Sequence, residues 1–118
     1  MKFKESKPIY LQIADRICDE ILQGKYKEER IPSVREYAAT VEVNANTVVR
    51  SFDYLQGQDI IYNKRGLGYF VIQGGRERIL ELRKEVFLRD ELPEFFRQLK
   101  TLDIPMKEIE KMYQCFLG

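Results

Sequence analysis

Residues 32 to 55 read Pro-Ser-Val-Arg-Glu-Tyr-Ala-Ala-Thr-Val-Glu-Val-Asn-Ala-Asn-Thr-Val-Val-Arg-Ser-Phe-Asp-Tyr-Leu, and this stretch predicts two short helices joined by a tight turn. Ser33 and Glu36 have the spacing of a capping box, in which each side chain satisfies a backbone N–H at a helix start. Asn44 is a residue type favoured at an N-cap. A second helix is therefore expected to begin near residue 44.

The second helix is predicted to have two different faces, because successive residues turn by about 100°. The inner face holds apolar or small residues and the outer face polar ones, namely Val48, Ser51, Phe52 and Leu55 against Asn46, Arg50 and Asp53. Short polar side chains at a helix N-terminus bind phosphates, and Asn and Arg can pair with base edges. On these residues alone, a major-groove interface and an ordinary solvated helix face are both open interpretations.

Length and composition predict a folded protein with one domain, or a small domain plus an oligomerisation segment. The chain has 118 residues, of which 44% are hydrophobic and 33% charged. No apolar run approaches the roughly 20 residues that span a bilayer, and the N-terminus does not resemble a signal peptide. We expect a cytoplasmic protein without a membrane partner.

The charge distribution argues against a strongly basic protein that binds nucleic acid regardless of sequence. The net charge is +1, and residues 1–72 hold 11 Lys or Arg against 10 Asp or Glu. Any DNA-binding surface must therefore be a local patch. Its natural cationic members are Arg35, Arg50, Lys64 and Arg65.

The residue inventory predicts no enzyme, no cofactor and no metal site. There is no histidine, and the two cysteines, Cys18 and Cys115, cannot form a four-cysteine zinc site. Both cysteines lie in apolar helical patterns and are expected to be buried free thiols. The glycines at 66, 68, 74 and 75 lack the context of a phosphate-binding loop.

The segments flanking the central pair have clear patterns of their own. Residues 8–23 predict a helix with Asp15, Arg16, Asp19 and Glu20 largely on its polar side and Gly24 at its end. After Gly57, the runs Ile60–Tyr62 and Tyr69–Ile72 predict a hairpin, with Asn63–Gly68 as the connection.

From Gly74 onward the pattern predicts long helices. Pro93 is expected to kink or restart the first, and Pro105 to open the last. These residues carry too many large apolar side chains for two helices that bury only each other, so a second copy of the chain is the expected partner. The candidate dimerisation residues are Ile79, Leu82, Val86, Phe95, Phe96, Leu99, Ile109, Met112, Tyr113 and Phe116.

Four linked motifs resemble the GntR family of bacterial transcription regulators. They are Pro8-Ile-Tyr-Leu-Gln-Ile, Ile31-Pro-Ser-Val-Arg-Glu, Val43-Asn-Ala-Asn-Thr-Val-Val-Arg and Arg65-Gly-Leu-Gly-Tyr-Phe-Val. The chain is most similar to the short YtrA-like branch. The resemblance implies a mainly α protein with a small β-hairpin: a winged helix-turn-helix at 1–73 and a two-helix dimerisation segment at 74–118.

The resemblance also implies that the arginine after Pro-Ser contacts DNA and that the hairpin is a wing over the minor groove. The candidate DNA-binding residues are Ser33, Arg35, Asn44, Ala45, Asn46, Thr47, Val49, Arg50, Lys64, Arg65 and Gly66. Two features depart from the family. The loop Lys25–Arg30 lacks its usual Pro-Gly turn, and Ala45 and Val49 stand where many members have arginine or another polar residue. These two small apolar groups either meet thymine methyls or only improve helix packing.

The sequence thus predicts a homodimeric regulator, most simply a repressor, that binds double-stranded DNA at an inverted repeat. Its dimer interface either holds a small-molecule effector or has none. The alternative is a winged-helix module whose outer face binds another protein.

Overall fold

The computed structural model describes residues 3, 6–26 and 29–118, so part of the loop that departs from the family lies outside the described residues. The chain divides into two compact units, Met1–Leu80 and Glu81–Gly118. The helix that follows the hairpin begins in the first unit, where its residues Gly75 and Ile79 are buried. The domain boundary between residues 73 and 74 stays a prediction.

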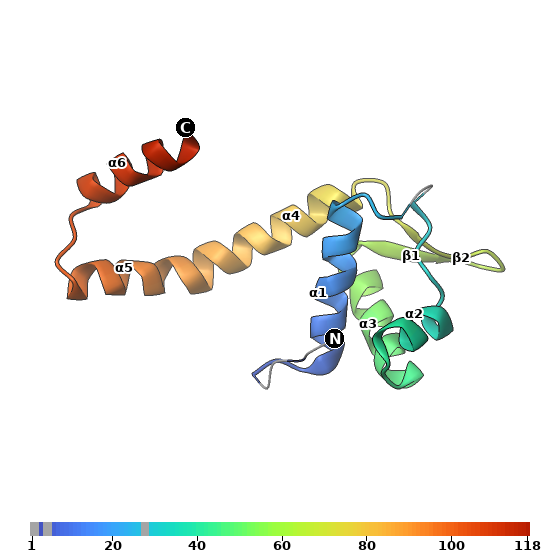
Figure 1. Ribbon diagram of the computed structural model, residues 1–118. Helices are drawn as coiled ribbons and strands as arrows, with labels where there is room; N and C mark the ends of the chain where they lie inside the picture. Colours follow the sequence, from blue (N-terminus) through green and yellow to red (C-terminus); the bar gives the residue numbers. More distant parts are fainter. Residues whose placement is uncertain (1–2, 4–5, 27–28) are drawn as a thin grey trace. The chain divides into compact units, whose positions relative to one another are not determined.

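Helix α1 (Ile9–Leu22) packs against α3 in the first unit (Figure 1). Its apolar residues recur at the helical spacing that the sequence predicts, and Ile13, Ile17 and Ile21 are buried. Gly24 follows the helix with a φ of 72°, the left-handed conformation expected after a helix end.

The central pair consists of α2 (Val34–Val41) and α3 (Ala45–Gly57), as predicted. The backbone N–H of Glu36 donates to Ser33 Oγ and that of Ser33 donates to Glu36 Oε1, both at 3.1 Å, which confirms the capping box. Asn44 caps α3 by accepting from the N–H of Asn46 at 2.7 Å. Between the helices, Glu42 has a φ of 56° and reverses the chain.

The hairpin consists of β1 (Ile61–Lys64) and β2 (Gly68–Val71), paired antiparallel with Ile61 opposite Val71. The strands extend further toward the turn than the apolar runs alone predicted, because backbone pairing continues to Lys64 and Gly68. A segment before α2 joins this sheet, since the N–H of Ile31 donates to the carbonyl of Tyr69 at 3.0 Å.

The core of the first unit lies where α1, α2, α3 and the base of the hairpin meet. Phe52 of α3 is fully buried, and its ring lies 4.8 Å from that of Tyr69 and 6.5 Å from that of Tyr37. These edge-to-face contacts tie the hairpin and α2 to the same side chain.

The second unit begins within α4 (Gly75–Val86), which continues through a π-helical turn, η2 (Phe87–Glu91), into α5 (Leu92–Thr101). Pro93 lies in the first turn of α5. The wider π-helical turn precedes the proline, whose ring removes a backbone donor, so the backbone stays helical instead of breaking. Pro105 is the N-cap of α6 (Met106–Leu117), as the sequence predicted.

The candidate dimerisation residues divide by exposure. Ile79 is buried in the first unit and Leu99 in the second, while Leu82 and Ile109 are half-buried. The other six are exposed, namely Val86, Phe95, Phe96, Met112, Tyr113 and Phe116. The prediction that both cysteines are buried is right for Cys18 and wrong for Cys115, because nothing in the described chain covers that side of α6.

No helix in the described ranges combines the length and the apolarity that crossing a bilayer requires.

Candidate nucleic-acid interface

Helix α3 presents two distinct faces, as the sequence predicted. Val48, Ser51, Phe52 and Leu55 are buried, whereas Asn46, Arg50 and Asp53 are exposed. Among the candidate residues of this helix, Ala45, Asn46, Val49 and Arg50 face solvent, and Thr47 is half-buried. The amide of Asn46 and the guanidinium of Arg50 are therefore exposed on a helix whose opposite side is fixed in the core.

The N-terminus of α2 adds a second cation. Arg35 is exposed, and its guanidinium makes no ion pair with any residue that the structure describes. The carboxylate of the neighbouring Glu36 accepts the capping hydrogen bond from the backbone N–H of Ser33. Hydrogen bonds from the backbone and side chain of Ser33 hold the pKa of Glu36 below its ordinary value. Glu36 thus stays ionised and bonded to Ser33. The guanidinium of Arg35 is therefore available to bind a ligand.

Tyr10 of α1 lies against the outer side of α3. The guanidinium carbon of Arg50 lies over the Tyr10 ring, 4.2 Å from its centroid, and the ring of Tyr54 meets Tyr10 edge-on at 6.5 Å. The buried hydroxyl of Ser51 donates to the backbone carbonyl of Tyr10 at 2.7 Å. Residues some forty positions apart in the sequence are thereby joined.

The hairpin carries the remaining candidates. Lys64, Arg65 and Gly66 are exposed at its turn, and Gly66 has a φ of 81°, which favours glycine. The ammonium of Lys64 lies 5.7 Å from the centroid of the Phe70 ring. These cations lie on a different element from those of α2 and α3.

Arg30 is a cation that the sequence analysis missed. A Cβ built on Gly68 would lie 3.5 Å from Arg30 Nε, and Arg30 also forms an isolated β-bridge with Phe70. The guanidinium therefore lies beside the turn end of β2, near the pair formed by Lys64 and Gly68. The sequence contains little that would predict the position of Arg30, because the loop before Ile31 departs from the family pattern.

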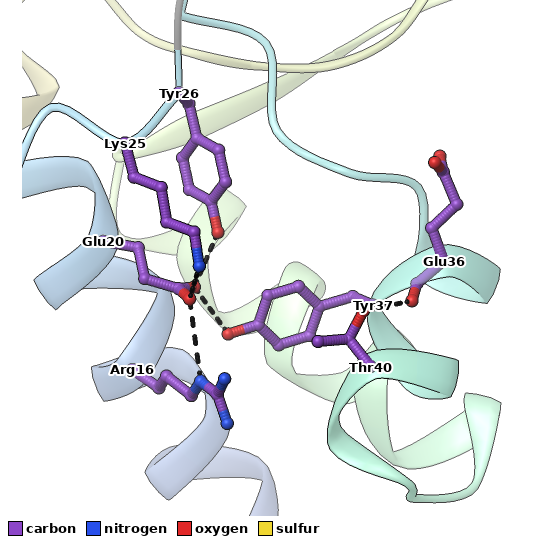
Figure 2. A network of polar contacts seen from close by, with 7 residues as sticks. All are labelled: Arg16, Glu20, Lys25, Tyr26, Glu36, Tyr37 and Thr40. Carbon is purple, nitrogen blue, oxygen red and sulfur yellow. Dashed lines mark hydrogen bonds and ion pairs between the residues drawn. The ribbon is translucent and has the colours of Figure 1, made fainter.

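A buried carboxylate anchors α2 to α1. Glu20 is only 7% exposed and accepts hydrogen bonds from the hydroxyls of Tyr26 (2.6 Å) and Tyr37 (2.7 Å) (Figure 2). Lys25 donates to it at 3.0 Å, and Arg16 lies 3.6 Å away, also on Glu20 Oε2. Three donors from two segments outside α1 thus meet one side chain of that helix.

Burial alone would raise the pKa of Glu20, but the hydrogen bonds from Tyr26, Tyr37 and Lys25 lower it further than burial raises it. The pKa of Tyr37 is raised, because burial and its hydrogen bond to Glu20 both favour the neutral phenol. The network therefore holds a carboxylate and neutral tyrosines.

Our assignment of Glu20 to the polar side of its helix was wrong. Glu20 follows Ile13 by nearly two helical turns, so it points toward the same side as that core residue. The periodicity contained this information, but a charged residue type suggested solvent. Partners that come from distant segments allow the charge to be buried.

Comparison with known proteins identifies the family. Residues 9–71 match the family model described as bacterial regulatory proteins, gntR family. The uncharacterized HTH-type transcriptional regulator YhcF of Bacillus subtilis is 35% identical over 98% of this chain and 94% of its own length. The HTH-type transcriptional repressor YtrA of the same organism is 28% identical over 94% of this chain and 83% of its own.

A crystal structure of a regulator assigned to the GntR family, from Bacteroides thetaiotaomicron, has 64% sequence identity and a TM-score of 0.81. The match covers 92% of this chain and 96% of that one. The family, these relatives and the winged helix-turn-helix agree with one another. The chain therefore belongs to the GntR family of bacterial regulatory proteins and is a DNA-binding transcription regulator, not an enzyme.

Proposed function

We propose that the protein is a homodimeric repressor that binds an inverted-repeat operator and thereby occludes a promoter. One observation carries this proposal: the exposed polar groups of α3 and the cation of α2 face solvent from helices whose inner faces are fixed in the core. The relative YtrA is a transcriptional repressor, which supports the sign of regulation.

We assign the major-groove contacts to the exposed ends of α2 and α3. Asn46 and Arg50 have side chains that can pair with base edges, and Arg35, Asn44 and Thr47 suit phosphates. Ser33 supports this surface by capping α2. The wing residues Lys64 to Gly66 would lie over the adjacent minor groove, where cations are attracted by the negative potential of a narrow groove.

Ala45 and Val49 give the operator a testable composition. Both are exposed on a flank of the outer face of α3, and Val49 is 40% exposed. Small apolar groups in the major groove contact thymine methyls. We therefore expect A·T pairs at the positions they reach, and guanine there would contradict the assignment.

Exposed apolar side chains of the second unit support the proposal that the protein is a dimer. Phe96 is 46% exposed, Met112 63% and Phe116 85%. Large apolar groups on several helical turns of one chain suit a self-complementary interface with two-fold symmetry. Two recognition helices would then face half-sites about 10 base pairs apart, centre to centre.

The proposal is tested by selecting bound duplexes from a random DNA library at about 150 mM salt, where non-specific binding is weak. We expect an inverted repeat. Arg50→Ala should cost about 1 to 3 kcal/mol at one base pair of each half-site if it reads a base. Lys111→Ala removes an exposed cation of α6 and serves as the matched control, with no expected change in the selected sequence.

Affinity for the selected duplex should fall steeply between about 50 and 200 mM salt, in proportion to the phosphates contacted. Absence of any enriched sequence, together with weak salt dependence, would instead favour a module that binds another protein through the outer face of α3.

A further inference from the structure

We propose that Tyr10 is a positioning residue for DNA recognition: it holds the guanidinium of Arg50 on its ring and so sets how Arg50 meets a base. The inference rests on the proposed function, because it concerns the same surface. It adds a residue of α1 to the proposed DNA-binding surface, which otherwise consists of residues from α2, α3 and the wing.

The first step is that Tyr10 is itself fixed in place. Its carbonyl accepts the hydrogen bond of Ser51, a side chain with no exposed surface. Its ring meets that of Tyr54 with an interplanar angle of 72°. Backbone and side chain are thus both attached to α3, which makes the ring a platform with a defined position on that helix.

The second step is that Arg50 uses this platform and nothing else within the described ranges. Its guanidinium carbon lies 4.2 Å from the ring centroid, a distance at which the ring attracts a cation. No carboxylate among the described residues forms an ion pair with Arg50, and the side chain is exposed. A contact with a ring face uses none of the five N–H donors of the guanidinium, so they stay available to a ligand.

The third step concerns what this contact does for recognition. A free arginine side chain has many rotamers, and ordering them on binding opposes affinity. Holding the guanidinium in one place before binding removes part of that cost. Bidentate pairing with a guanine edge depends on orientation, whereas attraction to a phosphate depends mainly on charge. Tyr10 should therefore affect base discrimination more than general affinity for DNA.

The test uses two replacements of Tyr10 in the full chain. Tyr10→Leu removes the ring face and keeps an apolar side chain, whereas Tyr10→Phe keeps the ring face and removes only the hydroxyl. Neither alters the backbone carbonyl that Ser51 uses. Each is combined with Arg50→Ala, and binding is measured to the selected operator and to operators changed at single base pairs.

We expect Tyr10→Leu to reduce discrimination by about 2- to 5-fold, the range given by an exposed cation–ring contact, at the one base pair where Arg50→Ala relaxes preference. Tyr10→Phe should behave as wild type, and Tyr10→Leu should have no further effect in the Arg50→Ala background. An equal loss for every sequence, or the same loss with and without Arg50, would overturn the inference.

Two further outcomes separate this inference from the proposed function. If the wild type selects an inverted repeat but Arg50→Ala relaxes no position, the positioning role fails and the proposed function stands. If the wild type selects no sequence, both fail. In the free protein, the δ-protons of Arg50 should show an upfield ring-current shift by NMR that is kept in Tyr10→Phe and lost in Tyr10→Leu. An unshifted wild-type signal would also overturn the inference.

Discussion

The two units of this protein differ in how far they bury their large apolar side chains. In Met1–Leu80, most apolar residues of the helices lie in a core in which Phe52, Leu55 and Val48 have no exposed surface. In Glu81–Gly118, where every residue is described, only Leu99 is buried, and Phe116 is 85% exposed. The first unit buries most of its own apolar surface, whereas the second leaves its large apolar side chains exposed, which supports the proposal that a second copy of the chain covers them.

This difference predicts that the same kind of substitution will have different consequences in the two units. In the first, truncation should change folding. In the second, it should change association. The expected change in the free energy of unfolding of dilute protein is largest at the centre of the first unit and smallest in the second unit.

The largest effect is expected at the centre of the first unit. Phe52→Ala should lower the free energy of unfolding by about 3 to 5 kcal/mol, because it leaves a cavity between Tyr37 and Tyr69. Urea unfolding followed by far-ultraviolet circular dichroism measures the change. A loss below about 1 kcal/mol would mean that the site collapses around the missing ring and that this core is less rigid than the contrast requires.

A smaller effect is expected at the buried carboxylate. Glu20→Ala should lower the free energy of unfolding by about 2 to 3 kcal/mol, since the hydroxyls of Tyr26 and Tyr37 lose a charged acceptor. Glu20→Gln keeps an acceptor and should cost less.

The same network has a pH dependence. The pKa of Glu20 is lower in the folded chain than its ordinary value, so its stabilising contribution is present above that value and is lost as pH falls through the folded-state pKa. Below about pH 5, wild type should therefore lose stability faster than Glu20→Gln. Parallel pH profiles for the two proteins would contradict this role.

The backbone of Gly75, at the start of α4, lies close to other residues of the first unit. A substitution at Gly75 therefore tests how closely α4 is packed there. A Cβ on Gly75 would lie 2.8 Å from both the carbonyl oxygen of Ile60 and Cγ1 of Val71. Gly75→Ala should therefore lower the free energy of unfolding by about 1 to 3 kcal/mol. Gly57→Ala is the matched control, because that site is open and helical, and it should raise stability by about 0.5 to 1 kcal/mol. Equal effects would show that α4 is not packed closely there.

The smallest effect on folding is expected in the second unit. Phe116→Ala should change the free energy of unfolding of dilute protein by less than about 0.5 kcal/mol, because the ring is exposed. Sedimentation at increasing protein concentration should nevertheless show weaker dimerisation than in Lys111→Ala, a control on the same helix. If dimerisation is unchanged, Phe116 lies outside the interface. If dilute Phe116→Ala protein instead unfolds readily, the second unit folds only as part of the dimer.

Much of the first unit follows from local sequence signals. The capping box, the N-cap at Asn44 and the two faces of α3 were all predicted, because each depends on residues within a few positions of one another. The hairpin was also predicted, although its strands extend closer to the turn, since backbone pairing does not stop where apolar residues stop. Periodicity likewise located the last helix and the proline that opens it.

The tertiary structure decided matters that depend on residues far apart in the chain. Glu20 is buried because tyrosines from two other segments supply its hydrogen bonds. Arg30 lies beside Gly68, and Tyr10 lies beneath Arg50, only because the first unit folds them together. Local patterns determine helices and their faces through steric and hydrogen-bonding rules that act over one or two turns. Which charge is buried and which ring supports an arginine are set by long-range packing, which no single stretch of the sequence contains.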